Sequence, residues 1–184
     1  AVGMIRESAS RARSLILEVT DMVYVAGTNP RLSTCRLSEV IAGVLDRGGS
    51  PSGLRDIATN KGIRVDLAGL DDLPQRNADK SLLITVFAYV IEQTINAMQE
   101  GGTIIVRGET DSRERSVRLN FIFQTIVRAP FPRYDDAWWD LAVYVLEAHG
   151  GRATMQHQPE GVTTLAFSFP VEWPPGEDAR TPTG

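Results

Sequence analysis

The stretch from Leu82 to Gly102 reads LLITVFAYVIEQTINAMQEGG and indicates a helix that ends at a glycine pair. Apolar residues lie nearly all round this helix, which we place at about Asp79 to Gln99, so it should be buried. Glu92 and Asn96 interrupt the apolar surface, and their spacing puts both side chains on one face. A carboxylate beside an amide at that spacing suits water activation and magnesium coordination at a nucleotide. The stretch therefore predicts a pocket helix.

The chain beyond this helix lacks the residue type that a phosphate-binding loop needs. From Glu109 through His149 there is no glycine. A loop that cradles phosphate requires several, because its bare backbone N–H groups must approach the phosphate oxygens closely. The sequence thus predicts a helix that lines a nucleotide pocket, but no glycine-rich loop that would bind the phosphates.

The first part of the chain carries a second periodic pattern. Apolar residues from Ile5 to Ala26 recur at three-to-four spacing, which predicts a long amphipathic helix over residues 1–28. Asn29-Pro30 breaks this helix. No other early segment covers its apolar stripe, so we expect a homodimer through this helix or pairing with a helix upstream. The alternative is packing against its own domain.

Shorter signals predict the other elements. Ser38 is the expected N-cap of a second helix, and Gly150-Gly151 are expected to end the last one. The elements expected between and after them are a helical turn at 54–60, a strand at 63–67, a hairpin of strands 103–107 and 117–123 joined at 111–114, a helix at 134–149, and strands at 152–156 and 163–169. This order predicts an α+β fold, a two-layer α/β sandwich with the helices on one face of the sheet.

Composition narrows the class of protein. The chain has 184 residues, 42% of them hydrophobic, which allows one compact domain at 29–173 between the first helix and a disordered tail at 174–184. A net charge of −4 with interspersed signs argues against a nucleic-acid partner. No apolar stretch approaches the roughly 20 residues of a membrane span, so we expect no membrane contact in this piece and a cytoplasmic location.

Cysteine and histidine usage excludes two further kinds of site. Cys35 is the only cysteine, so no internal disulfide forms, and we expect an ordinary, semi-buried thiol. His149 and His157 do not combine with it at any familiar ligand spacing, so we expect no metal site. His149 lies at a helix end, where the imidazole is expected to contact the last carbonyls in a structural role.

Three stretches together resemble one known family. They read LRDIATNKGIRVDL at 54–67, VIEQTINAMQEGGTIIV at 90–106 and VLEAHGGRATMQHQPEGVTTLAFSFPVE at 145–172. These are similar to the ATP-binding catalytic domain of sensor histidine kinases, within the gyrase, Hsp90, histidine-kinase and MutL fold. The resemblance spans almost the whole chain. It implies that residues 1–27 correspond to the second helix of the dimerisation and phosphotransfer hairpin.

The resemblance also assigns roles on the pocket helix. It implies that Asn96 stands at the magnesium-binding asparagine, and Glu92 at a position that holds a second asparagine, a histidine or a catalytic glutamate in the wider superfamily. The alternative is that Asn96 caps or bridges near the helix end and that Glu92 is solvated on an exposed edge. Neither His149 nor His157 matches the phosphoacceptor histidine of the family.

The chain departs from the family at both glycine motifs. An aspartate and glycines in a DxGxG pattern should follow the strand at 117–123, but the residues from Phe123 to Arg128 read FQTIVR. The second motif, GLGLA in many kinases, should open the last helix, where the chain reads DAWWD from Asp136. The lid between them shortens to VRAPFPRYDD, with two prolines that limit its mobility. We therefore expect no ATP cofactor bound in the usual manner.

Trp138 and Trp139 stand where phosphates would need bare backbone. Adjacent helix positions lie about 100° apart, so at most one of these indoles is expected to be fully buried. The other is a candidate contact residue for a partner protein.

Three functions remain open at this point. The first is a degenerate histidine-kinase catalytic domain, a pseudokinase or scaffold in a two-component or phosphorelay system. The second is an active kinase domain that binds Mg-ATP in an altered pose and phosphorylates a histidine on a missing upstream helix. The third is a histidine phosphotransferase that docks a response-regulator receiver domain and carries its phosphoacceptor upstream of Ala1.

Overall fold

The computed structural model describes residues 27, 29–46, 53–98, 101–125, 136–158 and 161–171. The helix expected over residues 1–28 lies outside these residues apart from Gly27, and so does the tail expected from residue 174. Homodimerisation through that helix therefore stays a prediction. Within the described part, no helix combines the length and apolar character that a membrane crossing requires.

The described elements alternate between helices and strands. In chain order they are β1 (Ser33–Cys35), α2 (Leu37–Asp46), α3 (Leu54–Asn60), β2 (Ile63–Ala68), β3 (Arg76–Ala78), α4 (Lys80–Ala97), β4 (Gly102–Asp111), β5 (Ser116–Gln124), α5 (Asp136–Ala148), β6 (Arg152–Gln158) and β7 (Val162–Pro170). The expected hairpin is β4–β5, and the expected final strands are β6 and β7.

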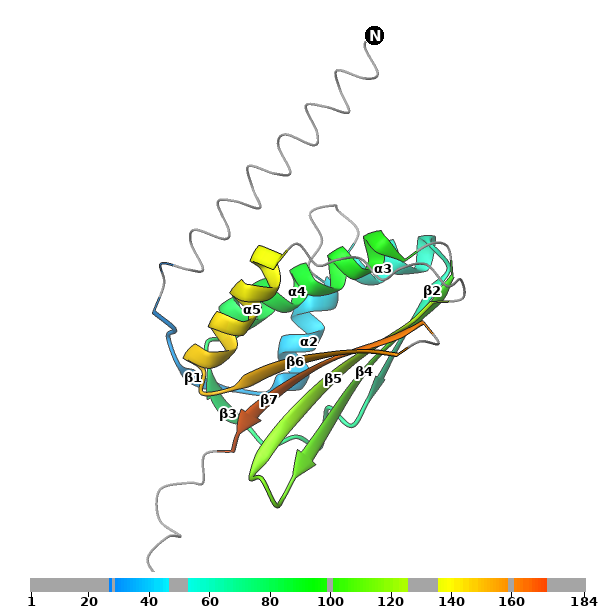
Figure 1. The fold of residues 1–184 in the computed structure, drawn as a ribbon. Helices are drawn as coiled ribbons and strands as arrows, with labels where there is room; N and C mark the ends of the chain where they lie inside the picture. Colours follow the sequence, from blue (N-terminus) through cyan, green and yellow to red (C-terminus); the bar gives the residue numbers. More distant parts are fainter. Residues whose placement is uncertain are drawn as a thin grey trace, which may run out of the picture.

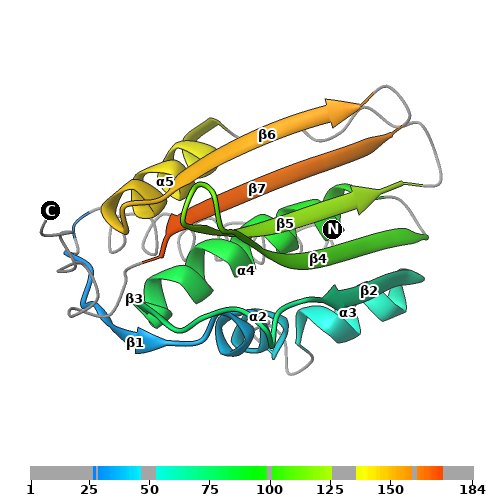
Figure 2. The same ribbon diagram turned by 90° about the horizontal axis from the view of Figure 1, so that it is seen from below.

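Five strands form the main sheet in the order β2-β4-β5-β7-β6. Only β2 and β4 run parallel, because α4 crosses over between them, whereas the remaining neighbours are antiparallel. The helices lie together on one face of this sheet (Figure 1). The view from below shows the opposite face with the strands side by side (Figure 2). The predicted two-layer α+β sandwich is confirmed.

The core lies between the two layers. Strand residues alternate between the faces, so every second side chain of β5 and β7 points at the helices and is buried. At its centre, Phe87 of α4 packs against Phe121 and Phe167, with ring centroids 5.3 and 4.9 Å away. All three rings are fully buried, which anchors α4 to the middle of the sheet.

One sequence prediction needs correction, and one feature was not predicted. Ser38 is not the N-cap of the second helix, because α2 starts at Leu37 and the carbonyl of Arg36 accepts its first hydrogen bonds, from the N–H groups of Glu39 and Val40. Leu37 is buried in the core, and its packing there includes it in the first turn of the helix. A small sheet of β1 and β3 was not predicted, since each strand has only three residues and pairs with a distant one.

Candidate functional site

Helix α4 carries the two candidate site residues. Its first turn is capped by Asp79, whose Oδ1 accepts a hydrogen bond of 3.1 Å from the backbone N–H of Leu82. One turn from its end, Glu92 is half-buried, and Asn96 in the last turn is exposed. The two residues lie four positions apart on one face, with Glu92 the deeper of the pair.

Lys61 closes the end of α4 next to Asn96. Its ammonium donates hydrogen bonds to the backbone carbonyls of Ile95 at 2.8 Å, Met98 at 3.1 Å and Asn96 at 3.3 Å. These carbonyls have no partner within a helix, and a cation at this end also interacts favourably with the helix dipole. Sequence reasoning missed Lys61, because these contacts join residues more than 30 positions apart.

The ammonium of Lys61 is fully engaged at this helix end. An ammonium has three donors, and the three carbonyls occupy those of Lys61, which leaves none for a phosphate oxygen. Among the described residues, no group of three or more His, Cys, Asp or Glu side chains is arranged to hold a metal ion.

The start of α5 is the second part of the candidate site. Trp139 is half-buried and packs against Phe167 of β7, with ring centroids 6.3 Å apart. The side chain of Trp138 lies outside the described residues, and so does the segment 126–135 with the expected lid. One indole thus packs against the core at the position where the family's second glycine motif is expected.

His149 connects the start of α4 to the end of α5. It is buried, and its Nε2 accepts a hydrogen bond of 2.9 Å from the backbone N–H of Asp79. Its Nδ1 is 2.6 Å from the carbonyl of Val145, which can only accept, so Nδ1 carries the proton. Burial lowers the pKa of His149 from its ordinary value, the hydrogen bond to Val145 opposes this, and the Arg76 guanidinium adds to the lowering. Because Nε2 accepts a hydrogen bond, the ring is neutral. The structural role expected for His149 is confirmed.

Arg76 and two glycines complete this junction. The Arg76 guanidinium lies 4.2 Å from the centre of the Phe169 ring, and its Nη2 donates to the carbonyl of His149 at 3.3 Å. Gly150 has a φ of +69°, and Gly151 N–H donates to the carbonyl of Leu146, which ends α5 as the glycine pair predicted. The junction lies at the opposite end of α4 from Asn96.

Comparison with known proteins gives no match to any protein-family model and none among curated proteins. Solved structures do match. Acinetobacter baumannii histidine kinase AdeS superposes with a TM-score of 0.66 at 12% identity, over 89% of this chain and 80% of that one. A catalytic domain of histidine kinase ThkA in a nucleotide-free form gives a TM-score of 0.60 at 17% identity, over 76% of this chain and 95% of that domain. This chain has the fold of a histidine-kinase catalytic domain.

A longer kinase shows the same domain in context. Full-length ShkA, solved in complex with AMPPNP, matches with a TM-score of 0.67 at 20% identity. The match covers 90% of this chain but only 37% of ShkA, so this chain corresponds to one part of that kinase.

Proposed function

We propose that this chain is a degenerate histidine-kinase catalytic domain that works as a pseudokinase or scaffold in two-component or phosphorelay signalling. The observation that carries the proposal is the run without glycine from Glu109 to His149, which spans both places where the fold's phosphate loops belong. Trp139 packing on Phe167, and the three carbonyls that occupy the Lys61 ammonium, add support. The domain accordingly takes no ATP cofactor in the usual pose.

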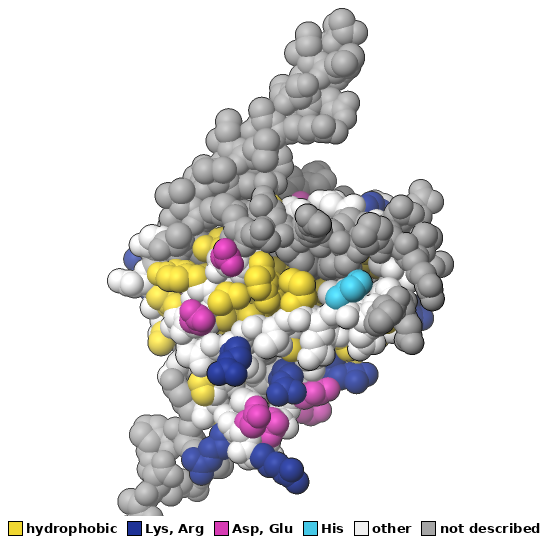
Figure 3. Space-filling model, viewed as in Figure 1, with side chains coloured by type: hydrophobic (Ala, Val, Ile, Leu, Met, Phe, Trp, Pro, Cys, Tyr) yellow, Lys and Arg dark blue, Asp and Glu magenta, His cyan; other side chains and the backbone are white. Residues whose placement is uncertain are grey.

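A scaffold needs an accessible contact surface, and α5 with the adjoining β6 offers one. Tyr144 of α5 is 50% exposed and Met155 of β6 is 39% exposed. Figure 3 shows hydrophobic side chains gathered over this part of the molecule, with acidic side chains at the edge of the patch. Apolar surface rimmed by charge is typical of protein–protein contacts.

Titration calorimetry tests the proposal directly. The full chain with magnesium and ATP should give a dissociation constant weaker than about 1 mM, equivalent to a binding free energy of about −4 kcal/mol or weaker. An active histidine-kinase catalytic domain measured alongside serves as the positive control. Micromolar, magnesium-dependent binding would refute the proposal. If such binding disappeared in Asn96→Ala, the second function, an active kinase domain with Asn96 at magnesium, would replace it.

The third function, a phosphotransferase that docks a receiver, has one supporting finding. Histidine kinase ThkA in complex with response regulator TrrA matches with a TM-score of 0.67 at 17% identity, over 92% of this chain and half of that one. His149 cannot accept a phosphoryl group while both of its ring nitrogens are engaged. His157 does not match the family's acceptor position either, so this hypothesis places the acceptor upstream of Ala1. A sequence without a histidine in that preceding helix eliminates this function.

A further inference from the structure

The face of the sheet that points away from the helices carries a hollow of about 700 Å3. It is formed by outward-facing residues of β5, β7 and β6 and by the turn at Gly150-Gly151. Its volume is in the range of small-molecule sites. Its lining is mainly polar, with Asn120, Thr154 and Thr164 among the side chains at its surface. A ligand for this hollow would therefore be polar.

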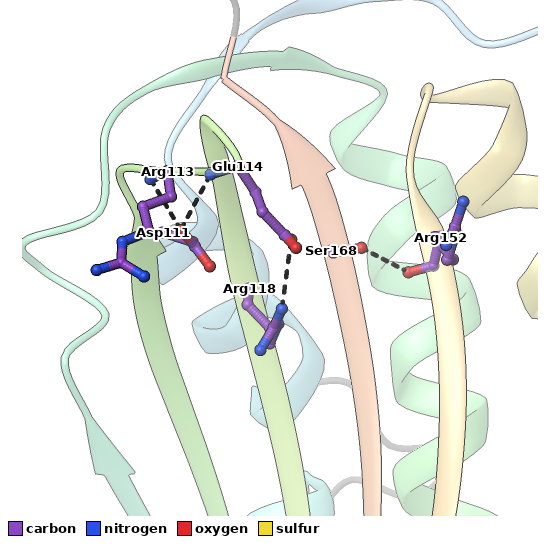
Figure 4. Close-up of polar contacts among 6 residues, drawn as sticks. All are labelled: Asp111, Arg113, Glu114, Arg118, Arg152 and Ser168. Atoms are coloured by element: carbon purple, nitrogen blue, oxygen red, sulfur yellow. Dashed lines mark hydrogen bonds and ion pairs between the residues drawn. The ribbon is translucent and has the colours of Figure 1, made fainter.

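One row of the sheet brings two arginines to either side of a serine in this hollow. Ser168 of β7 pairs in register with Arg118 of β5 on one side and with Arg152 of β6 on the other. Neighbouring strands lie about 4.8 Å apart, so the two arginine Cα atoms are about 10 Å apart. Figure 4 shows the three residues across their adjacent strands. Two guanidinium side chains at this separation can reach a single anion placed over Ser168.

The charge of the hollow is positive. Its lining holds two guanidinium groups and one carboxylate, that of Glu114. Glu114 pairs with Arg118 at 3.6 Å, and both side chains are exposed, so the pair is loose. Arg152 forms no ion pair with any described residue. The nearby Asp111 carboxylate is engaged by the backbone N–H groups of the β4–β5 turn.

A buried hydroxyl in the same hollow has no partner among the described residues. Ser116 is only 7% exposed, and its Oγ makes no hydrogen bond to any residue that the structure describes. It lies two residues before Arg118 on the same face of β5, within about 7 Å along the strand. Leaving a buried hydroxyl unpaired costs stability, so such groups commonly meet a ligand or an ordered water.

We propose that this hollow binds a small polar molecule through a phosphate or carboxylate group. Arg118 and Arg152 hold the anion from two sides, above Ser168, whose hydroxyl donates a hydrogen bond of 3.4 Å to the backbone carbonyl of Arg152 (Figure 4). Ser116 bonds to a second polar group of the same molecule. This site lies on the sheet face opposite α4, so it is separate from the nucleotide position of the fold and does not depend on the proposed function.

An NMR titration of the full 15N-labelled chain tests the site, with inorganic phosphate and citrate as separate probes. Shifts that saturate in the amides of Ser116, Arg118 and Ser168 are expected for at least one probe, and the tighter one tells phosphate from carboxylate. Arg152→Gln should raise the dissociation constant by roughly tenfold or more, because it removes a charge-assisted bidentate contact. Arg107→Gln is the matched control, because Arg107 is exposed on β4 and outside the lining.

The control should change the dissociation constant by less than about threefold, the size of a screened surface-charge effect. Equal losses in Arg107→Gln and Arg152→Gln would overturn the proposal, as would the absence of saturable shifts with either probe. Ser116→Ala separates a ligand contact from a packing role. It should weaken binding and raise the melting temperature of the free protein, and unchanged binding would overturn the assignment of Ser116 to the site.

Discussion

The backbone N–H of Asp79 donates a hydrogen bond of 2.9 Å to Nε2 of His149, across 70 residues of sequence. Asp79 is the N-cap of α4 and His149 follows the last residue of α5, so this bond fastens the start of one helix to the end of the other. The carboxylate of Asp79 also accepts a bond of 2.8 Å from the N–H of Arg31. A single buried junction therefore holds together the segment around Arg31, the start of α4 and the end of α5.

Removing the imidazole should destabilise the domain. His149→Ala leaves the N–H of Asp79 buried without its acceptor, so we expect a loss of roughly 1–3 kcal/mol in the free energy of unfolding. Urea denaturation followed by circular dichroism measures it. Gln156→Ala is the control, because Gln156 is exposed on β6, and it should change stability by less than about 0.5 kcal/mol. Equal effects of the two substitutions would contradict the role of the junction.

The same imidazole makes stability depend on pH. Burial lowers the pKa of His149 below its ordinary value of 6.5, so the unfolded chain binds a proton more readily than the folded one. Its contribution is therefore complete above pH 6.5 and is lost as the pH falls toward the folded-state pKa. We expect the urea concentration at the unfolding midpoint to decrease as the pH is lowered from about 7 to about 5, a range in which most carboxylates stay charged. His149→Gln should flatten this slope, and an unchanged slope would assign it to other groups.

The ammonium of Lys61 should stabilise α4 measurably. Lys61→Met removes three hydrogen bonds to helix-end carbonyls and a favourable charge, and we expect a loss of about 1–2 kcal/mol in unfolding free energy. Lys80→Met is the control with the same change of side chain. Lys80 pairs with Glu39 at 2.8 Å, but the two side chains are 43% and 53% exposed, so solvent screens the pair and its loss should cost less than about 1 kcal/mol. A cost for Lys80→Met as large as that for Lys61→Met would rule out a special role for Lys61.

Cys35 should react slowly with thiol reagents in the folded protein. The residue is 7% exposed, and burial raises the pKa of its thiol, so little thiolate is available for attack. A disulfide reagent at neutral pH should modify it many times more slowly in buffer than in concentrated guanidinium chloride, where the single cysteine gives one full equivalent. Rapid labelling of the native chain would show that β1 opens readily.

Local sequence signals predicted the long elements well. The apolar pattern of α4 and the glycines after α4 and α5 act within a few residues, so they set the helix ends regardless of what packs nearby. The β1–β3 sheet escaped prediction because it depends on pairs such as Thr34 with Asn77, whose attraction exists only after the chain has folded. The start of α2 was misplaced because burial of Leu37 prevailed over the capping preference of Ser38.

The candidate site was predicted in part for the same reason. Helical periodicity alone places Glu92 and Asn96 on one face of α4. Their different depths, half-buried and exposed, depend on the neighbouring elements, and no local pattern encodes them. Lys61 and the Asp79–His149 bond were missed as interactions because each joins residues that are distant in sequence.

The sequence by itself determined which long segments form helices and strands, the two-layer arrangement, and the absence of glycine where phosphate loops belong, since these follow from composition and short-range periodicity. Only the tertiary structure decided which side chains meet. The carbonyls of α4 receive Lys61, the N–H of Asp79 finds His149, and Arg118 and Arg152 lie on either side of Ser168. Such contacts arise from strand register and helix packing, which the burial of the whole core selects at once.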